Sequence, residues 1–250
     1  MPRIKNIAVF IGLSLVLLGF IGFVEKQTMD KFYLDREVYI EGESGLYFVE
    51  DKEIDDIISQ GFPELIAGLP LSQVPLNDIE ERLMGHPFVN GAQAYIGQKG
   101  VLQLHVKQHR PVARIVRPRA ADGYITEEGK IIPTSNSYTS RVIVIYGDLA
   151  DKLMDQGNVM SEVPELMDLI EFVDEDEFWK AQITEIELRS KSDIRLYQQV
   201  GSQVLELGSA QDLEEKFEKL EVFYKEILPR KGWNAYNRVS VKFKNQIVCE

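Results

Sequence analysis

The sequence predicts an α+β protein with a single N-terminal transmembrane helix and two folded domains behind it. Three observations support this prediction: an uncharged run over residues 7–24, a helix and two pairing strands over residues 77–107, and a later region of short apolar runs that closes with an amphipathic helix over residues 210–228. A chain of 250 residues is long enough for two small domains.

The first element is the run from Ile7 to Val24, which carries no charged residue. As a helix it would measure roughly 27 Å at about 1.5 Å per residue, close to the hydrocarbon thickness of a bilayer. A cleaved signal peptide would end in a small-x-small motif, and this run does not. We therefore expect a retained single-pass helix over residues 7–24, a short cytoplasmic head at residues 1–6 and a juxtamembrane connector at residues 25–34.

The stretch over residues 35–110 predicts strand, helix, loop, helix and hairpin in that order. Asn77 is the expected N-cap of the second helix, and Gly85 is expected to end it in the left-handed conformation that glycine accepts. The last strand alternates apolar and polar residues, as a half-buried strand does. The expected elements are a strand over 38–49, helices over 51–60 and 77–85, and strands over 89–96 and 101–106.

A different pattern begins at Pro111 and predicts a second domain over residues 111–250. We interpret Pro111 to Arg119 as the hinge, because Pro111 and Pro118 bracket a short apolar run. The clearest element is the helix at residues 210–228, whose apolar residues repeat at intervals of four and three. The other expected elements are strands over 141–146, 183–188, 194–197, 203–207 and 239–248, and a helix over 160–173.

The composition and the motifs exclude several classes of function. A net charge of −12 would repel a nucleic acid. A single cysteine, Cys249, leaves no intrachain disulfide and no cysteine-based zinc site. His105 and His109 would be about 13 Å apart on a strand and could not share a metal ion. We therefore expect no catalytic residue, no cofactor, no metal and no small-molecule substrate; the chain is expected to act by binding and not as an enzyme.

One set of residues within these elements is specific enough to indicate a protein family. It comprises Gly85, Pro87, Val89, Leu102, Leu104, Val106, Arg110, Pro111, Val112 and Ala113. These residues resemble the second half of a POTRA domain in the FtsQ/DivIB family of bacterial division proteins. In that family a helix ends at a small residue before P-x-V, and a hairpin ending in L-x-I-x-V leads to E-R-x-P-V-A. The chain departs from the pattern at His109, where an acid is usual, and at Leu104, where a β-branched residue is usual.

The resemblance extends over the whole chain and implies its organisation and its role. It implies a POTRA domain at residues 35–110, with a three-stranded sheet under two helices, and a β-domain with a C-terminal helix and strand at residues 111–250. It implies a non-enzymatic scaffold of the divisome that binds the bitopic division proteins FtsB and FtsL and supports septum formation. The expected location is the cytoplasmic (inner) membrane at the division septum, with the N-terminus in the cytoplasm and the C-terminal domains outside it.

The last strand carries the expected partner-binding residues. Val239 to Phe243 resembles the family motif V-D-L-R-Y, whose Arg-Tyr end belongs to the surface that receives FtsB. A terminal strand also easily lies at a sheet edge, where it can accept another strand. Alternation places Phe243 on the same face as Val239 and Val241, so a position in the core is as consistent with the sequence as a position on the partner-binding surface. The expected partner-binding residues are Val239, Ser240, Val241, Lys242, Phe243 and Lys244.

Two other classes of protein remain as alternatives. One is a membrane-anchored cell-envelope enzyme, which would need an active site that the motifs do not contain. The other is a POTRA-type component of an outer-membrane transport system. Such a protein would need many amphipathic barrel strands after residue 110, and the remaining chain is short for them.

Overall fold

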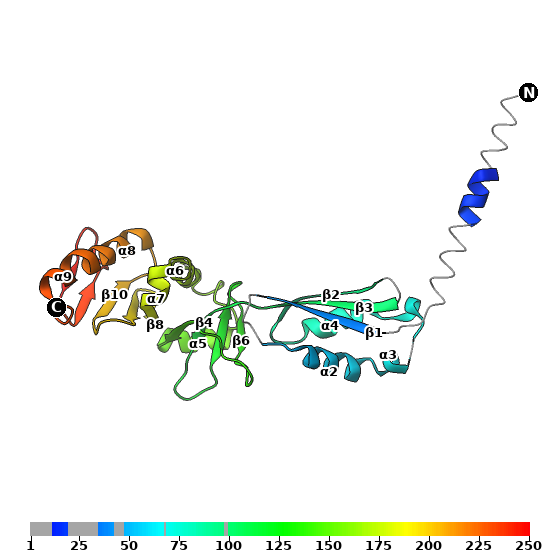
Figure 1. Ribbon diagram of the computed structural model, residues 1–250. Helices are drawn as coiled ribbons and strands as arrows, with labels where there is room; N and C mark the ends of the chain where they lie inside the picture. Colours follow the sequence, from blue (N-terminus) through cyan, green and yellow to red (C-terminus); the bar gives the residue numbers. More distant parts are fainter. Residues whose placement is uncertain (1–11, 20–34, 43–47, 68, 98–99) are drawn as a thin grey trace, which may run out of the picture. The chain divides into compact units, whose positions relative to one another are not determined.

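The computed structural model describes residues 12–19, 35–42, 48–67, 69–97 and 100–250 (Figure 1). The chain divides into two compact units. Unit 1 comprises residues 1–42 and 49–108, and unit 2 comprises residues 43–48 and 109–250.

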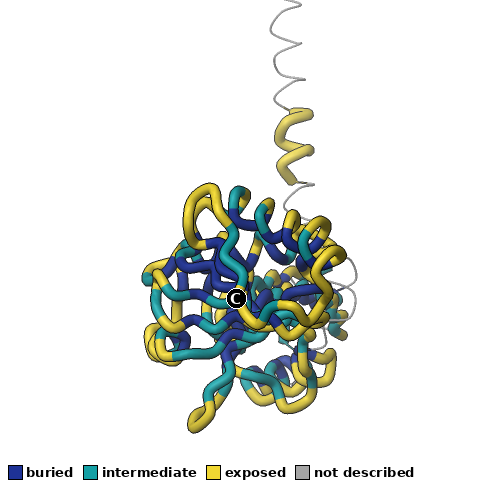
Figure 2. Tube along the Cα trace, turned by 90° about the vertical axis from the view of Figure 1, so that its left-hand side faces the viewer, coloured by how far each residue is buried: buried dark blue, intermediate teal, exposed yellow. Residues whose placement is uncertain are grey.

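The predicted fold class needs one correction, which concerns the transmembrane helix. Residues 12–19 are helical, and their side chains are exposed (Figure 2). Among the residues that the structure describes, no helix is long and apolar enough to cross a membrane. The rest of the predicted span, the head at 1–6 and the connector at 25–34 lie outside the described residues.

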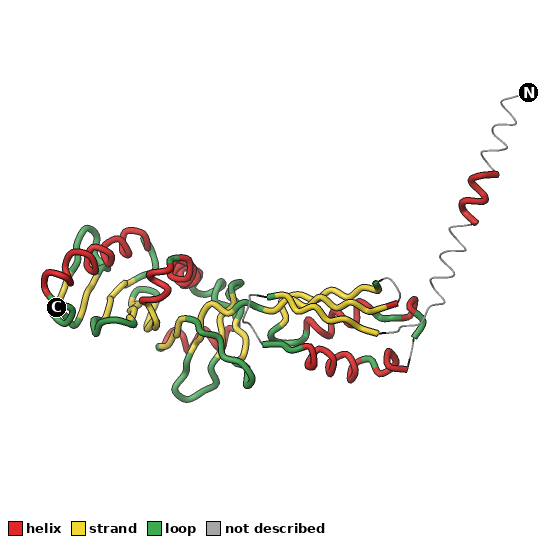
Figure 3. Tube along the Cα trace, in the orientation of Figure 1, coloured by secondary structure: helices red, strands yellow, loops and turns green. Residues whose placement is uncertain are grey.

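Unit 1 packs its helices on one face of a three-stranded sheet (Figure 3). The strands lie in the order β1-β3-β2, with β1 parallel and β2 antiparallel to β3. Leu102, Leu104 and Val106 alternate along β3 and are fully buried, because they form the face that the helices cover. The elements are β1 (Asp35–Glu41), α2 (Asp51–Gly61), α3 (Pro63–Ala67), the 3₁₀ turn η1 (Leu71–Gln73), α4 (Leu76–Met84), β2 (Val89–Ile96) and β3 (Val101–Gln108).

The predicted order of strand, helix, loop, helix and hairpin is confirmed, but the strand predicted over residues 38–49 is β1, which ends at Glu41, and the predicted loop contains α3 and η1. Two details of α4 are also corrected. The helix begins at Leu76 behind Pro75, one residue before the predicted N-cap Asn77. Gly85 follows α4 with φ −69° and ψ −13°, which is the right-handed and not the left-handed region. Ile79 and Leu83 are buried as their four-residue spacing predicts.

Unit 2 is built on a mixed sheet. Among the described residues it has nine strands in the order β12-β11-β10-β9-β8-β7-β4-β5-β6. The strands are β4 (Pro111–Ile115), β5 (Gly123–Thr126), β6 (Ile131–Pro133), β7 (Ile143–Tyr146), β8 (Ile183–Ser190), β9 (Asp193–Gln198), β10 (Val204–Gly208), β11 (Arg238–Ser240) and β12 (Val248–Cys249). The helices are α5 (Asp148–Gln156), α6 (Pro164–Glu175), α7 (Glu177–Gln182), α8 (Leu213–Val222), the π-helical turn η3 (Phe223–Ile227) and α9 (Leu228–Lys231).

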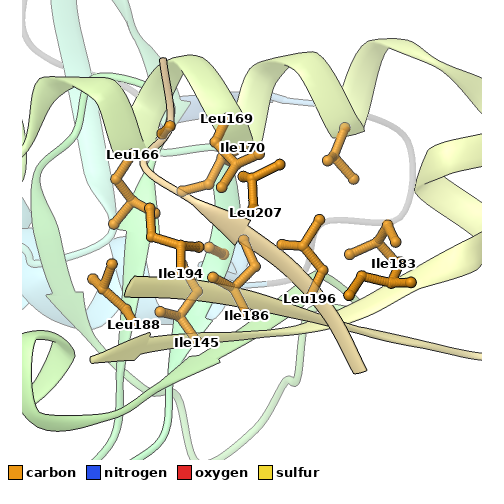
Figure 4. Packing of buried hydrophobic residues seen from close by; sticks show 14 of the residues in the cluster. Ile145, Leu166, Leu169, Ile170, Ile183, Ile186, Leu188, Ile194, Leu196 and Leu207 are labelled. Carbon is orange, nitrogen blue, oxygen red and sulfur yellow. The ribbon is translucent and has the colours of Figure 1, made fainter. Parts of the chain in front are cut away.

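The core of unit 2 lies between the sheet and its helices. Figure 4 shows Leu166, Leu169 and Ile170 of α6 packed over buried side chains of the central strands. One row of these side chains runs in register across the sheet, since each member is the direct partner of the next. The row is Ile115, Ile145, Ile186, Leu196, Leu205, Val239 and Cys249.

The proposed hinge is partly a strand. Pro111 to Ile115 forms β4, which pairs with β5 on one side and with β7 on the other. Val112, Ala113 and Ile115 are buried, as expected for a run too apolar for a free linker. Pro111 is accommodated because the register of β4 against β5 shifts between Pro111 and Ala113, so a ladder hydrogen bond from Pro111 is not needed there.

We predict that Gly147 is the glycine that unit 2 tolerates changing least. It has φ +121°, and a Cβ there would lie 2.6 Å from the backbone oxygen of Leu188. Gly147→Ala should therefore lower the free energy of unfolding by roughly 2 kcal/mol or more in urea titrations. Gly157→Ala is the matched control, because Gly157 also has a positive φ (+76°) but no atom within 4 Å of the added carbon. It should cost about 1 kcal/mol. Equal losses in the two variants would contradict the steric explanation.

Candidate partner-binding surface

The predicted strand over residues 239–248 is two short strands in the structure. β11 ends at Ser240, and the chain then turns through a loop in which Asn245 has φ +58°. It returns as β12, which pairs antiparallel with β11. The prediction of one continuous terminal strand was therefore wrong, because alternating residues do not reveal a turn that lies between them.

The six predicted partner-binding residues fall into a buried half and an exposed half. Val239, Ser240 and Val241 are at most 4% exposed, whereas Lys242, Phe243 and Lys244 are exposed. The Phe243 side chain is 46% exposed, so it lies on the surface and not in the core. The loop begins after Val241, and residues beyond it no longer follow the alternation of β11.

Helix α8 holds the loop in place. Nζ of Lys219 donates a hydrogen bond to the backbone oxygen of Phe243 at 2.8 Å. Lys219 also pairs with Glu215 at 2.8 Å, and Glu215 accepts a hydrogen bond from the Asn245 amide at 3.3 Å. The hydrogen bond from Lys219 has the larger effect on the pKa of Glu215, and together with that from Asn245 it holds this pKa below its usual value. Since both anchors are on one helix, the exposed loop has a defined position on unit 2.

Lys242 is held by a carboxylate in the neighbouring strand. The Glu206 side chain is 9% exposed, and Lys242 Nζ lies 3.4 Å from its Oε2. Arg238 contacts the other oxygen at 3.3 Å, and Arg195 lies 4.0 Å from the same oxygen. A buried carboxylate needs such partners, because an unpaired buried charge is strongly destabilising. Lys242 therefore has a structural role beside any role in binding, which the sequence did not reveal.

β12 is the outermost strand at this end of the described sheet. Arg238 and Glu250 exchange both backbone hydrogen bonds, at 3.0 and 2.9 Å. In an antiparallel ladder such a pair alternates with a pair whose backbone groups point away from each other. Val239 and Cys249 form that next pair, so the N–H and C=O of Cys249 face the outer side of β12. This side of the sheet has the geometry to accept a further strand.

The opposite edge, β6, differs from β12. The Ile131 amide faces outward and already donates to the oxygen of Gly157 at 2.9 Å. Two residues on, Pro133 occupies the next outward position and has no amide hydrogen. Neither outward position of β6 therefore has a free amide hydrogen to donate to a new strand.

A model described as "FtsQ/DivIB, C-terminal related" matches residues 110–250, and a POTRA-like domain model matches residues 35–107. The chain belongs to the FtsQ/DivIB family. Family membership indicates a role in cell division, and proteins of this family generally act without catalysing a reaction. No curated protein matches the chain.

The histidines and acids do not assemble into a metal centre in the part of the chain that the structure describes. His105 lies between Tyr39 and Tyr95 on the exposed face of the unit 1 sheet, with ring centroids 4.7 and 5.4 Å away. His109 is buried in unit 2. Burial lowers its pKa, and the Glu128 carboxylate 3.3 Å away opposes that effect in part.

We predict that Lys242 and Lys244 differ in their effect on stability. Lys242→Glu places a second carboxylate beside the buried Glu206 and should lower the free energy of unfolding by about 1–2 kcal/mol. Lys244→Glu is the control with the same charge change; it should lower stability by less than about 0.5 kcal/mol, because Lys244 is exposed. Urea unfolding of the two variants measures the difference. A Lys242→Glu variant as stable as Lys244→Glu would show that the Glu206 contact contributes nothing.

Proposed function

We propose that this FtsQ/DivIB family protein is a non-enzymatic scaffold of the division machinery. In this proposal it acts at the division site in association with the membrane, binds division proteins of the FtsB/FtsL type and supports septum formation. The partner binds at the C-terminal end of unit 2, on the outer side of β12 and on the exposed loop that carries Lys242, Phe243 and Lys244. No reaction is assigned to the chain.

The observation that supports this proposal best is the outward-facing backbone of Cys249. Strand addition uses main-chain hydrogen bonds for affinity and nearby side chains for specificity. The outer side of β12 supplies the main-chain hydrogen bonds, whereas the outward positions of β6 at the other edge have no free amide hydrogen. The loop supplies the side chains for specificity, because Phe243 is exposed and aromatic side chains are common anchors of interfaces.

The charges of the loop favour an acidic partner segment. Lys244 is exposed, and Lys242 lies 5.3 Å from the centre of the Phe243 ring while pairing with Glu206. An acidic side chain beside Phe243 would meet both ammonium groups. Such rim charges mainly set the association rate and the salt dependence, whereas the backbone pairing sets the lifetime of the complex.

We predict that Cys249→Pro abolishes co-purification of the FtsB/FtsL-type partner. Proline removes the outward amide hydrogen and leaves the internal hydrogen bonds of Arg238 with Glu250 intact. Cys249→Ala is the matched control: it changes the half-buried side chain but keeps the amide, and it should retain the partner. Melting temperatures of both variants should stay within a few degrees of the parent, which separates loss of binding from loss of folding.

The same pair of variants can refute the proposal. Retention of the partner by a folded Cys249→Pro variant would rule out strand addition at β12. Loss of the partner in both variants would assign the effect to the cysteine side chain and not to the backbone. A fluorescent fusion of the full chain that does not gather at the septum would contradict the division role itself.

A further inference from the structure

An apolar groove runs beside α6, on elements different from those of the C-terminal surface. Its volume is about 430 Å³, and its apolar lining comes from Val112, Met160, Met167 and Ile170. Met160 is 50% exposed, while Met167 and Val112 are nearly buried behind it. Methionine side chains adapt their shape to different ligands, and surfaces rich in them are common at peptide-binding sites.

The rim of the groove is acidic. The carboxylates that line it are Glu127, Asp168, Glu171, Asp174 and Glu175. Arg110 also lines it and pairs with Asp174 at 2.6 Å and with Glu127 at 3.7 Å. Lys180 pairs with Asp174 at 2.6 Å. Burial alone would raise the pKa of Asp174, but hydrogen bonds from Lys180 and Arg110 outweigh it and hold that pKa below its usual value. Asp174 is therefore already neutralised within unit 2.

Three further carboxylates of α6 lack such compensation. Asp168, Glu171 and Glu175 are exposed, and no ion pair joins them to a base in the described parts of the chain. They are three and four residues apart, so they repel one another along one face of the helix by about 0.2–0.5 kcal/mol per pair. Glu175 also lies at the C-terminus of α6, where the helix dipole disfavours a negative charge.

A second groove on the other side of this face extends the acidic surface. It shares Asp168, Glu171 and Glu175 and adds Phe172 and residues at the start of α8. These residues include Asp212, Leu213 and Glu214. The exposed face of α6 thus has an apolar groove on one side, a largely acidic groove on the other and uncompensated negative charge along its length.

We propose that the groove beside α6 is a docking site for a basic, amphipathic segment of another protein. Several Lys or Arg side chains of that segment would pair with Asp168, Glu171 and Glu175, and one or two of its apolar side chains would enter the groove over Met160 and Met167. Small cations alone would neutralise the carboxylates but would leave the apolar groove over Met160 and Met167 unfilled. This site goes beyond the proposed function, because it selects a partner whose charge is opposite to that favoured at the C-terminal loop.

The proposal is tested with the full chain and a synthetic helical peptide in which Lys and Leu form opposite faces. Binding is followed by fluorescence anisotropy of the labelled peptide. The variant Asp168→Asn/Glu171→Gln/Glu175→Gln should bind about tenfold more weakly, because it removes the charges that the peptide meets. The matched control is Asp56→Asn/Glu64→Gln/Glu81→Gln, which makes the same three changes at exposed positions of unit 1 and should bind as the parent does.

The apolar part of the site is tested separately. Met160→Ser should weaken Lys/Leu peptide binding several-fold with little change in melting temperature, because Met160 is half exposed. A peptide with Ser in place of Leu should bind the parent protein as weakly as the Lys/Leu peptide binds the α6 variant. Equal weakening by the unit 1 control would overturn the proposal in favour of a general effect of net charge. Equal binding of the Lys/Ser and Lys/Leu peptides would overturn it in favour of a solvated acidic helix.

Discussion

One row of apolar side chains, in register across seven neighbouring strands from Ile115 to Cys249, holds unit 2 together. It joins segments that are far apart in sequence and forms part of the surface on which α6 and the other helices of unit 2 pack. The next row, on the opposite face, contains Glu187, Arg195 and Glu206, which pair across the strands. A shift of one residue in any strand would exchange the two rows and place these charges in the apolar core. The position of β12, and with it the outward backbone of Cys249, depends on this register.

Most strands of the chain could be predicted, because one side of each sheet is buried and the sequence alternates accordingly. β8, β9 and β10 lie within a few residues of the predicted runs, as do both strands of the unit 1 hairpin. The helix expected over residues 210–228 is present as α8, η3 and α9, and it continues past Pro229 to Lys231. Proline is tolerated there because it lies in the first turn of α9. The short helices α5 and α7 were missed, since each offers too few turns for a helical period to show.

The candidate surface was predicted only in part, because its key features depend on contacts distant in sequence. The motif at residues 239–243 located the right segment, but nothing local indicates that Lys242 faces Glu206 of another strand. Phe243 fits the alternation of a core residue until the loop after Val241 ends the strand. The outward direction of the Cys249 amide follows from the hydrogen-bonded pair of Arg238 and Glu250, which only the register shows. The acidic face of α6 is visible in the sequence, but the groove beside it is not.

The lack of a free outward amide on β6 limits how copies of this protein can associate through the unit 2 sheet. Growth of a filament by edge-to-edge pairing needs two open edges on every molecule, so that each copy can bind one neighbour before it and one after it. Within the described sheet of unit 2, only the outer side of β12 meets that need. If two copies pair through their β12 strands, each uses its one open edge of this sheet, and the series ends with two copies. The sheet can therefore keep one edge open for binding without the polymerisation that a second open edge would allow.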